Sequence, residues 1–310
     1  MHAKPAAFFA FLAASSLAHA ANYMDQANEK YNEGKTIQAI ELYKKAALAG
    51  ENPALCYFNM ANAYFQIDSL PHSIVYYKAC IGYAPEFFRA HLNLAIAYHS
   101  LDDIGACVAS ARRALDLEPN DEKALLILAA SYRRAGAYPE AIATFEQIAL
   151  LYPANDESYV ALAEMNRELG DHEGAVEWLL RYPEGGRNEA YVNILLADIY
   201  ENKGDLQRAV YHLNLAYEKD DTNKWVLYRK VLLLEKSGNE LVALETARRG
   251  LENRPSFAEL ALLAGNISFN LEKHNDAERY YTVARNNGSA GAVIGLENVR
   301  VVRLQQAEND

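Results

Sequence analysis

Several features of enzymes and membrane proteins are missing from this sequence of 310 residues. After residue 20, no apolar run approaches the roughly 20 residues that a membrane-spanning helix needs. There is no Gly-rich phosphate loop, no G-x-S-x-G nucleophile turn and no H-E-x-x-H zinc motif. The sequence therefore predicts neither a transmembrane span beyond the N-terminus nor a catalytic site of these kinds.

The histidines are too dispersed to indicate a metal site. His91 and His99 would share a helix, but eight residues are two helical turns, too far for two ligands of one ion. Carboxylates are numerous, yet no pair stands out from those expected on a solvated helix face. We expect no cofactor, no metal and no enzymatic activity. The histidines concerned are His72, His91, His99, His172, His212 and His274.

Basic residues are too few to favour a polyanionic partner. The chain has 30 Lys and Arg against 41 Asp and Glu, a formal net charge of −11. Sequence-independent nucleic-acid binding needs clustered basic side chains that release counterions. Anionic membrane surfaces likewise attract basic segments. The charge balance argues against both as the main partner.

The N-terminus has the features of a secretion signal. Lys4 supplies a short positive region, and residues 6–17 (AAFFAFLAASSL) are an apolar run too short to span a bilayer comfortably. Residues 18–20 (AHA) form a small-x-small cleavage site, and no cysteine nearby indicates a lipid anchor. We interpret residues 1–20 as a cleaved signal peptide of a periplasmic or secreted protein. The alternative is an uncleaved hydrophobic helix.

The remaining chain repeats a unit that residues 120–153 show most clearly. This stretch contains two apolar stripes at helical spacing, separated by Gly136 and ended by Pro153. Pro139 stands where the second helix would begin, a position that tolerates proline. The unit is therefore two antiparallel helices with one apolar face each, and it can bury both faces only by stacking on neighbours.

Small residues recur in two columns of this unit at a period of 34 residues. Because small side chains let helices cross closely, each pair marks the crossing point of one helix pair. The period does not slip over eight units. The pairs are Ala27 and Ala39, Ala61 and Ser73, Ala95 and Cys107, Ala129 and Ala141, Ala163 and Ala175, Ala197 and Ala209, Val231 and Ala243, and Gly265 and Ala277.

This pattern resembles the tetratricopeptide-repeat (TPR) family, whose 34-residue motif is W-x2-L-G-x2-Y, then A-x3-F, then P. The fourth unit reads L-x2-L-A-x2-Y, then A-x3-F, then P. The resemblance implies an all-α fold, a right-handed α-solenoid of antiparallel helix pairs with a concave face lined by the first helices. It also implies binding of peptide segments or partner domains. The eight repeats expected within residues 21–289 are approximately 20–53, 54–87, 88–121, 122–155, 156–189, 190–223, 224–257 and 258–289.

Two regions depart from the regular pattern. In the fifth repeat the second helix is expected to stop early, at Tyr182-Pro183, and the acidic stretch around it indicates either a bend or a loop variant. Residues 290–310 are expected to form a capping helix and a polar tail. In that helix Val293, Val299 and Leu304 recur on one side at helical spacing, as the end of a solenoid requires.

The cysteines allow two interpretations. Cys56, Cys80 and Cys107 are an odd number for an exported protein, and each can act as a small apolar filler. Cys56 begins the first helix of repeat two and Cys80 ends the second helix of that repeat. Antiparallel pairing brings these helix ends together, so a Cys56–Cys80 disulfide is compatible with the expected geometry.

Amide and cationic side chains gather on the face expected to be concave. Asparagine can donate to and accept from the backbone of an extended peptide, and Arg or Lys can hold a carboxylate. We therefore expect a partner-binding groove for a protein or peptide on the first four repeats. Its candidate residues are Asn28, Asn59, Asn62, Arg89, Asn93 and Lys123, with Arg133 and Arg134 further along.

This groove resembles the carboxylate clamp of TPR domains that hold acidic C-termini. Asn28, Asn59 and Arg89 fall on three positions of that clamp, whereas Met24 replaces its first lysine and Asn93 replaces an arginine. The clamp is therefore partial, and the alternative is that these are ordinary polar residues of solvated helices. In the later repeats the same columns become acidic and aromatic: Glu164, Asp198, Trp225, Tyr228, Glu235 and Phe269.

The leading functional hypothesis is an exported TPR scaffold that binds a protein or peptide on its concave face and assembles or regulates a cell-envelope complex. An accessory subunit of an envelope enzyme, or an enzyme with an unrecognised site, is the alternative. A third hypothesis is an aerotolerance-type component, because residues 52–66 (NPALCYFNMANAYFQ) resemble exported TPR proteins of such operons.

Overall fold

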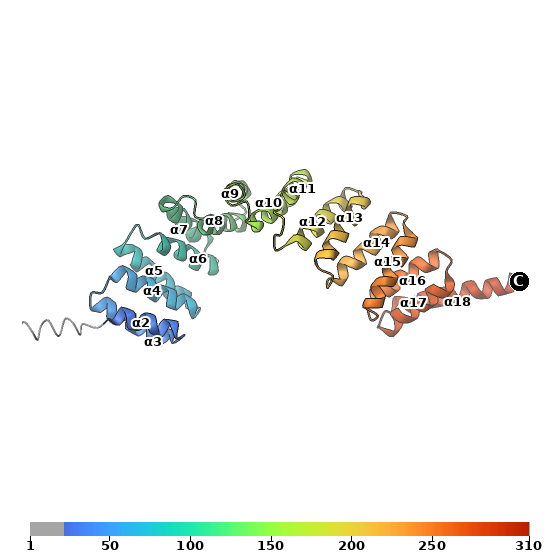
Figure 1. Ribbon diagram of the computed structural model, residues 1–310, viewed down its shortest axis with the longest axis horizontal. Helices are drawn as coiled ribbons and strands as arrows, with labels where there is room; N and C mark the ends of the chain where they lie inside the picture. Colours follow the sequence, from blue (N-terminus) through green and yellow to red (C-terminus); the bar gives the residue numbers. More distant parts are fainter. Residues whose placement is uncertain (1–21, 310) are drawn as a thin grey trace, which may run out of the picture. The chain divides into compact units, whose positions relative to one another are not determined.

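The computed structural model describes residues 22–309, and every regular element in this part of the chain is an α-helix (Figure 1). The expected signal peptide lies outside the described residues. The helices are α2 (Tyr23–Asn32), α3 (Thr36–Leu48), α4 (Pro53–Gln66), α5 (Leu70–Tyr83), α6 (Phe88–Ser100), α7 (Ile104–Leu117), α8 (Glu122–Arg134), α9 (Tyr138–Leu151), α10 (Asp156–Glu168), α11 (His172–Leu180), α12 (Glu189–Asn202), α13 (Leu206–Lys219), α14 (Lys224–Lys236), α15 (Glu240–Asn253), α16 (Ala258–Asn270), α17 (His274–Asn286) and α18 (Gly291–Asn309).

The helices form eight consecutive pairs, α2/α3 to α16/α17, followed by α18. The predicted all-α solenoid of helix pairs is therefore confirmed, and the number of pairs agrees with the eight repeats found from the period. None of the described helices is both long and apolar enough to cross a membrane.

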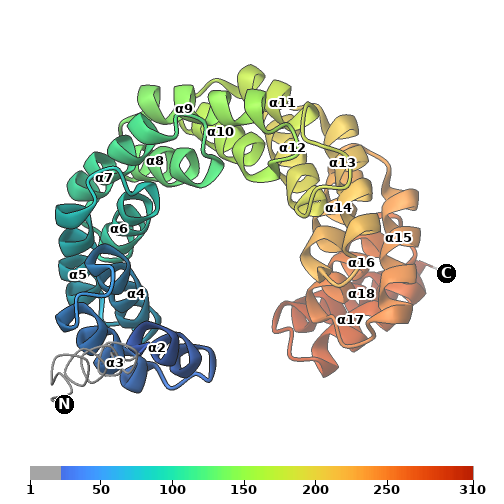
Figure 2. The same ribbon diagram turned by 60° about the vertical axis from the view of Figure 1, so that its left-hand side comes forward.

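The chain divides into two compact units, one ending at Ser158 and one beginning at Tyr159, and each is described by itself. In the first unit, α4, α6 and α8 form one row and α5, α7 and α9 form the other (Figure 2). The small-residue columns lie where the rows meet, and Ala61, Ala95 and Ala129 are fully buried there. The close crossings expected from these residues are thus present.

In the second unit, the same column contains Gly265, and a tyrosine explains the glycine. A Cβ on Gly265 would come within 2.6 Å of the ring of Tyr281. The ring lies across the crossing of α16 and α17 and occupies the space that an alanine methyl group fills in other repeats. Even alanine is therefore too large at this crossing.

The turn within each pair uses left-handed backbone at one fixed column. Glycine takes this conformation without a steric cost and ends many helices in this way. Three repeats use a non-glycine residue instead, with φ of 57° at Asp68, 62° at Asp102 and 59° at Glu272. The tertiary packing of the pairs therefore holds the turn in repeats that lack the favoured residue.

The fifth repeat has the shortest second helix, α11, which ends at Leu180 as the sequence predicted. The loop after it is built around Tyr182, whose hydroxyl accepts a hydrogen bond from the Asn188 backbone N–H at 2.8 Å. A Cβ on Gly186 would come within 2.5 Å of the same ring. The loop is thus a specific local structure, and the bend expected here stays a prediction.

The last helix packs on the second unit with only part of its apolar residues. Ala292 and Val299 of α18 are buried in the core cluster that includes Tyr281. Val293 and Leu304, which share the helical spacing of Val299 in the sequence, are each 56% exposed. The helix therefore covers the end of the core but also presents apolar side chains to water.

Candidate functional site

Asparagines on two first helices are held by buried tyrosines of the same repeat. The Tyr43 hydroxyl donates to Asn28 Oδ1 at 2.7 Å, and the Tyr77 hydroxyl donates to Asn62 Oδ1 at 2.6 Å. Both tyrosines are 2% exposed, and burial raises the pKa of each to about 12. The hydroxyls therefore stay protonated as donors, and each asparagine oxygen serves as their acceptor.

A second set of amides links these asparagines from one repeat to the next. Asn59 Nδ2 donates to Asn28 Oδ1 at 3.4 Å, and Asn93 Nδ2 donates to Asn62 Oδ1 at 2.9 Å. We call these four residues, from α2, α4 and α6, the amide ladder. Because both acceptor oxygens are occupied, the Nδ2 groups of Asn28 and Asn62 are left as donors.

The ladder borders a cavity in the first unit. The cavity has a volume of about 450 Å³. Amide groups form its polar part and aromatic rings form much of the rest, as expected for a groove that binds a peptide backbone and its side chains. The lining residues are Tyr31, Asn62, Phe65, Gln66, Tyr77, Asn93 and Ile96.

Two of the four predicted cations remain without an ionic partner. Arg89 and Lys123 are exposed, and neither forms an ion pair within residues 22–309. Arg89 lies one turn before Asn93 on α6 and so shares its helix face. Arg134 instead pairs with Asp102, with 2.9 Å between Nε and Oδ1, and Arg133 is half-buried. The structure therefore joins the amides with Arg89 and removes Arg134 from the set of free cations.

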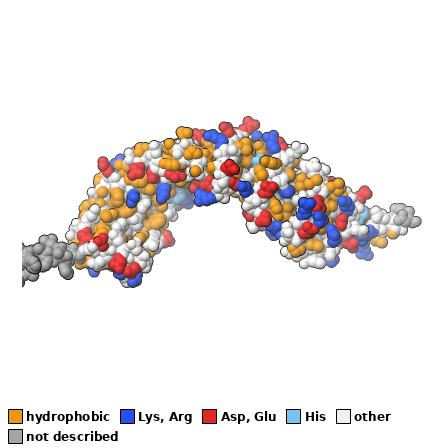
Figure 3. All heavy atoms as spheres, in the orientation of Figure 1, with side chains coloured by type: hydrophobic (Ala, Val, Ile, Leu, Met, Phe, Trp, Pro, Cys, Tyr) orange, Lys and Arg blue, Asp and Glu red, His pale blue; other side chains and the backbone are white. Residues whose placement is uncertain are grey.

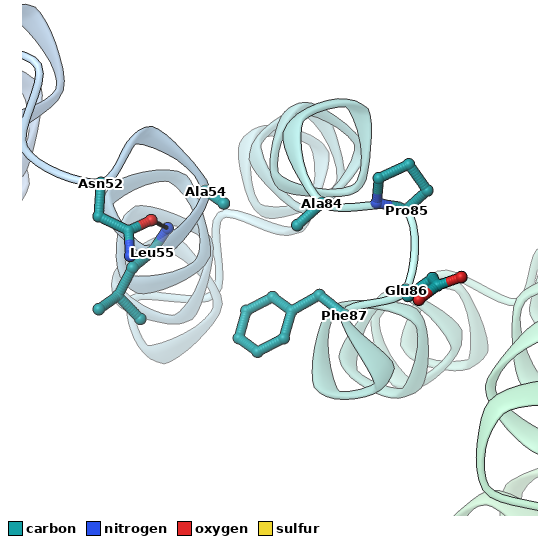
Figure 4. A pocket seen from close by; sticks show the side chains of 7 residues that line it. All are labelled: Asn52, Ala54, Leu55, Ala84, Pro85, Glu86 and Phe87. Atoms are coloured by element: carbon teal, nitrogen blue, oxygen red, sulfur yellow. Dashed lines mark hydrogen bonds between the residues drawn. The ribbon is translucent and has the colours of Figure 1, made fainter.

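An apolar pocket that the sequence analysis missed lies at the start of α4 and the α5–α6 loop (Figure 4). Its volume is about 700 Å³. Figure 4 shows the Phe87 ring pointing towards Leu55 across the pocket, while the Glu86 carboxylate points away. Leu55 stands in the column that contains Arg89 and Lys123 in the next two repeats, and this apolar exception was the available signal. The lining residues are Asn52, Ala54, Leu55, Ala84, Pro85, Glu86 and Phe87.

In the second unit, the first helices carry an ion-pair network instead of amides. Arg229 Nη1 lies 2.6 Å from Asp198 Oδ1, and its Nη2 lies 3.0 Å from Glu201 Oε2. Lys236 Nζ lies 3.3 Å from Glu201 Oε1, and Arg167 Nη1 lies 4.0 Å from Asp198 Oδ2. The charges on this face therefore neutralise one another within the chain.

Burial and hydrogen bonding oppose each other at Glu201. Burial by itself would raise the pKa of this carboxyl group, but hydrogen bonds from Arg229 and Lys236 lower it below its ordinary value. For Arg229, burial would lower the pKa, and the pairs with Glu201 and Asp198 raise it instead. Both groups are thus held in their charged forms.

Trp225 is on the surface of the second unit rather than in the core position that we favoured for it. It is 48% exposed and packs edge-on against Phe257 and Tyr228, with ring centroids 5.5 and 5.9 Å apart. Lys224 Nζ lies 5.0 Å from the centre of the Trp225 ring and 4.8 Å from that of Phe257. The chain's own lysine therefore occupies this aromatic cluster.

The disulfide considered for Cys56 and Cys80 is not formed, and all three cysteines are buried free thiols. Cys56 Sγ donates to the Glu51 carbonyl oxygen at 2.8 Å, on the side of α4 that faces the first repeat. Cys80 packs in the cluster that contains Leu94 of α6, on the side of the third repeat. The helix ends are close, but the two side chains point to opposite sides, so both act as fillers.

Within residues 22–309, no group of three or more His, Cys, Asp or Glu side chains is placed to hold a metal ion. His212, for example, bonds Asn193 Oδ1 at 2.9 Å and stacks on Tyr200. The dispersed histidines therefore have local structural partners.

Two tetratricopeptide-repeat family profiles match the chain, one over residues 54–87 and 88–121 and one over residues 132–199. These ranges coincide with the helix pairs described above. The chain is a tetratricopeptide-repeat protein. Its fold is therefore the scaffold type of a family of protein-interaction modules.

Solved structures agree with this assignment at the level of the fold. A crystal structure of MamA protein is 21% identical, covers 59% of this chain and 92% of its own, and has a TM-score of 0.50. A tetratricopeptide repeat protein from Parabacteroides merdae ATCC 43184 is 13% identical, covers 80% of this chain and 98% of its own, and has a TM-score of 0.52. No curated protein sequence matches the chain.

Proposed function

We propose that this TPR protein is exported and binds an extended segment of a partner protein on the face formed by α2, α4 and α6, as a scaffold that assembles or regulates a cell-envelope complex. The observation that carries the proposal is the tie from Tyr77 to Asn62 to Asn93. It fixes amide groups at the wall of a cavity before any ligand arrives. Preorganised donors bind more tightly because less side-chain freedom is lost on binding.

The direction of the hydrogen bonds selects the chemistry of the ligand. Tyrosine and asparagine donors already occupy Oδ1 of Asn28 and Asn62, so the Nδ2 groups of these residues are what a ligand can meet. Arg89 adds a positive charge on the same face of α6. Donors and a cation together suit main-chain carbonyl groups and a carboxylate, as in the carboxylate clamp that the sequence resembles.

The apolar pocket supplies a second specificity element. Phe87 lines it and precedes Arg89 by two residues, so the pocket and the cation belong to the same end of α6. A segment that places a carboxylate near Arg89 can therefore place an apolar side chain between Leu55 and Phe87. We infer that the preferred ligand combines an acidic group with a neighbouring Leu-, Met- or Phe-like side chain.

The binding claim is tested with fluorescent pentapeptides of the form acidic–apolar at a free C-terminus, each compared with its C-terminal amide. Arg89→Ala with Lys123→Ala should weaken binding of the free acids by more than about tenfold, because hydrogen bonds to charged groups contribute about 1.5–3 kcal/mol. Lys45→Ala, an exposed lysine on the second helix α3, is the matched control. Equal affinity for acids and amides, or an unchanged double variant, would refute the carboxylate part of the proposal.

Export is a separate claim with its own test. The support for it is the charged, apolar and small-residue order of residues 1–20. N-terminal sequencing of the protein from its native cells should show a chain that begins at Ala21. A chain that retains the first twenty residues in the cytosolic fraction would remove the envelope part of the proposal and leave the peptide-binding part standing.

A further inference from the structure

The last helix, α18, breaks a rule that the earlier first helices obey. One column near the end of every first helix is polar in all eight repeats, and α18 has Leu304 there. That leucine is 56% exposed, so packing within the chain does not account for it. The polar residues of this column are Asn32, Gln66, Ser100, Arg134, Glu168, Asn202, Lys236 and Asn270.

Leu304 ends a stripe of four exposed side chains along α18, which we call the terminal stripe: Val293, Glu297, Arg300 and Leu304. Their separations of four, three and four residues place them on one helix face. The side chains of Glu297 and Arg300 are 62% and 72% exposed and form a 3.7 Å ion pair with each other. The stripe also borders a cavity of about 560 Å³ between α18 and α17, where Arg285 lies. No other helix within residues 22–309 contributes to the lining of this cavity.

The terminal stripe has the same order of apolar and charged positions in both directions along the helix, with opposite charges at its centre. We propose that this face of α18 docks on α18 of a second copy of the chain, antiparallel and about a two-fold axis. In a two-fold interface, residue i meets j and residue j meets i. Val293 then faces Leu304 of the second copy at both ends, and Glu297 faces Arg300 of the second copy twice at the centre.

Neighbouring residues extend the same match. The axis that pairs Val293 with Leu304 also places Leu296 opposite Val301 of the second copy. It covers Ile294 with the stem of Arg303 of the second copy, and Ile294 is 67% exposed in the single chain. The column of Ile294 is buried in every one of repeats two to eight. Those buried residues are Cys56, Ala90, Ala124, Ser158, Val192, Val226 and Leu260.

The charges decide the orientation of the pair. In a parallel arrangement in register, Glu297 would meet Glu297 and Arg300 would meet Arg300, and like charges in contact oppose association. A helix of this length spans about 28 Å. Two such helices bury less than the roughly 1,200 Å² of a standard interface, so we expect a weak dimer with a micromolar dissociation constant.

The test is a charge swap followed by sedimentation equilibrium over a wide concentration range. Glu297→Arg alone places arginine against Arg300 of the second copy, and Arg300→Glu alone places glutamate against Glu297. Each variant by itself should dimerise at least about tenfold more weakly than the wild type. An equimolar mixture of the two variants should form a heterodimer, because both central pairs are then opposite in sign.

Glu259→Arg is the matched control, since Glu259 is an exposed carboxylate on the preceding first helix, and it should dimerise like the wild type. Thermal melting of each variant verifies the fold. A wild-type chain that stays monomeric, single variants that dimerise normally, or a mixture that stays monomeric would each overturn the antiparallel pair. The stripe uses no residue of the amide ladder, so peptide binding by the charge-swap variants reports separately on the proposed function.

Discussion

The two units build their inner faces from the same repeat columns with opposite outcomes. In the first unit, Asn62 and Asn93 lie 31 residues apart and share a hydrogen bond. In the second, Asp198 and Arg229 lie 31 residues apart and form an ion pair of 2.6 Å. One geometric contact between successive first helices thus carries an amide pair in one unit and an ion pair in the other.

The difference determines what each face can still bind. The amide pair leaves donor groups and two cations, Arg89 and Lys123, without partners in the described chain. The ion pairs of the second unit instead satisfy each other, and Figure 3 shows acidic and basic side chains intermixed there. A TPR face is therefore open to a charged ligand only where its charges lack intramolecular partners.

Removing the amide from the ladder should have the largest effect. Asn62→Ala leaves the buried Tyr77 hydroxyl without its acceptor, which typically costs about 1–3 kcal/mol. This corrects our sequence-based expectation that Asn62 could be replaced without harm to folding. Urea unfolding should show the loss, and adding Tyr77→Phe should recover part of it. A variant as stable as the wild type would show that the tie to Tyr77 is not structural.

Removing the central cation of the second unit should cost less. Arg229→Met leaves Asp198 and Glu201 facing each other without their shared partner, and we expect a loss of roughly 1–2 kcal/mol at low salt. The loss should shrink at high salt because ions screen partly exposed charges. The Asn62→Ala loss should not change with salt, and the same salt dependence for both variants would break the comparison.

Alkaline pH should weaken the first unit selectively. The pKa of Tyr43 and Tyr77 is raised to about 12 in the folded chain, against an ordinary value of 10.0. Because the folded values are raised, their contribution to stability is complete below pH 10 and is lost as the pH rises from 10 towards 12. Unfolding free energy measured against pH should fall over this window, and Tyr43→Phe with Tyr77→Phe should flatten the fall.

Acid should produce the smallest change, and it should come from the second unit. The pKa of Glu201 is lowered from its ordinary value of 4.5, so its contribution is present above that pH and is lost as the pH falls below it. Solvent screens these partly exposed pairs, which limits the effect. Glu201→Gln should make the acid limb of the stability curve shallower, and an identical limb would exclude this carboxylate.

Much of the fold could be predicted because the relevant signals are local and periodic. The spacing of Ala61, Ala95 and Ala129 indicated where helices cross, and Gly136 and its equivalents indicated the turns. The asparagine ties also had a signal that we did not use. Asparagine follows the first small column only in repeats one, two and eight, and a tyrosine stands 15 residues later each time; in repeat eight, Tyr281 donates to Asn266 Oδ1 at 2.9 Å.

Other features had no such signal, because they depend on the direction of a side chain after packing. The ends of α4 and α5 meet, as expected, but Cys56 and Cys80 point to opposite sides of the pair. Trp225 fits a core position and an exposed one equally well in the sequence. The pocket between Leu55 and Phe87 joins residues from two repeats that no short-range pattern connects.

The sequence by itself determined that this protein is a stack of eight helix pairs, because a 34-residue period of small and apolar residues can be buried only by stacking. Only the tertiary structure decided which polar residues remain available to a ligand. That outcome depends on which neighbour each side chain meets: Asn62 meets a tyrosine and an amide, Asp198 meets an arginine, and Arg89 meets water.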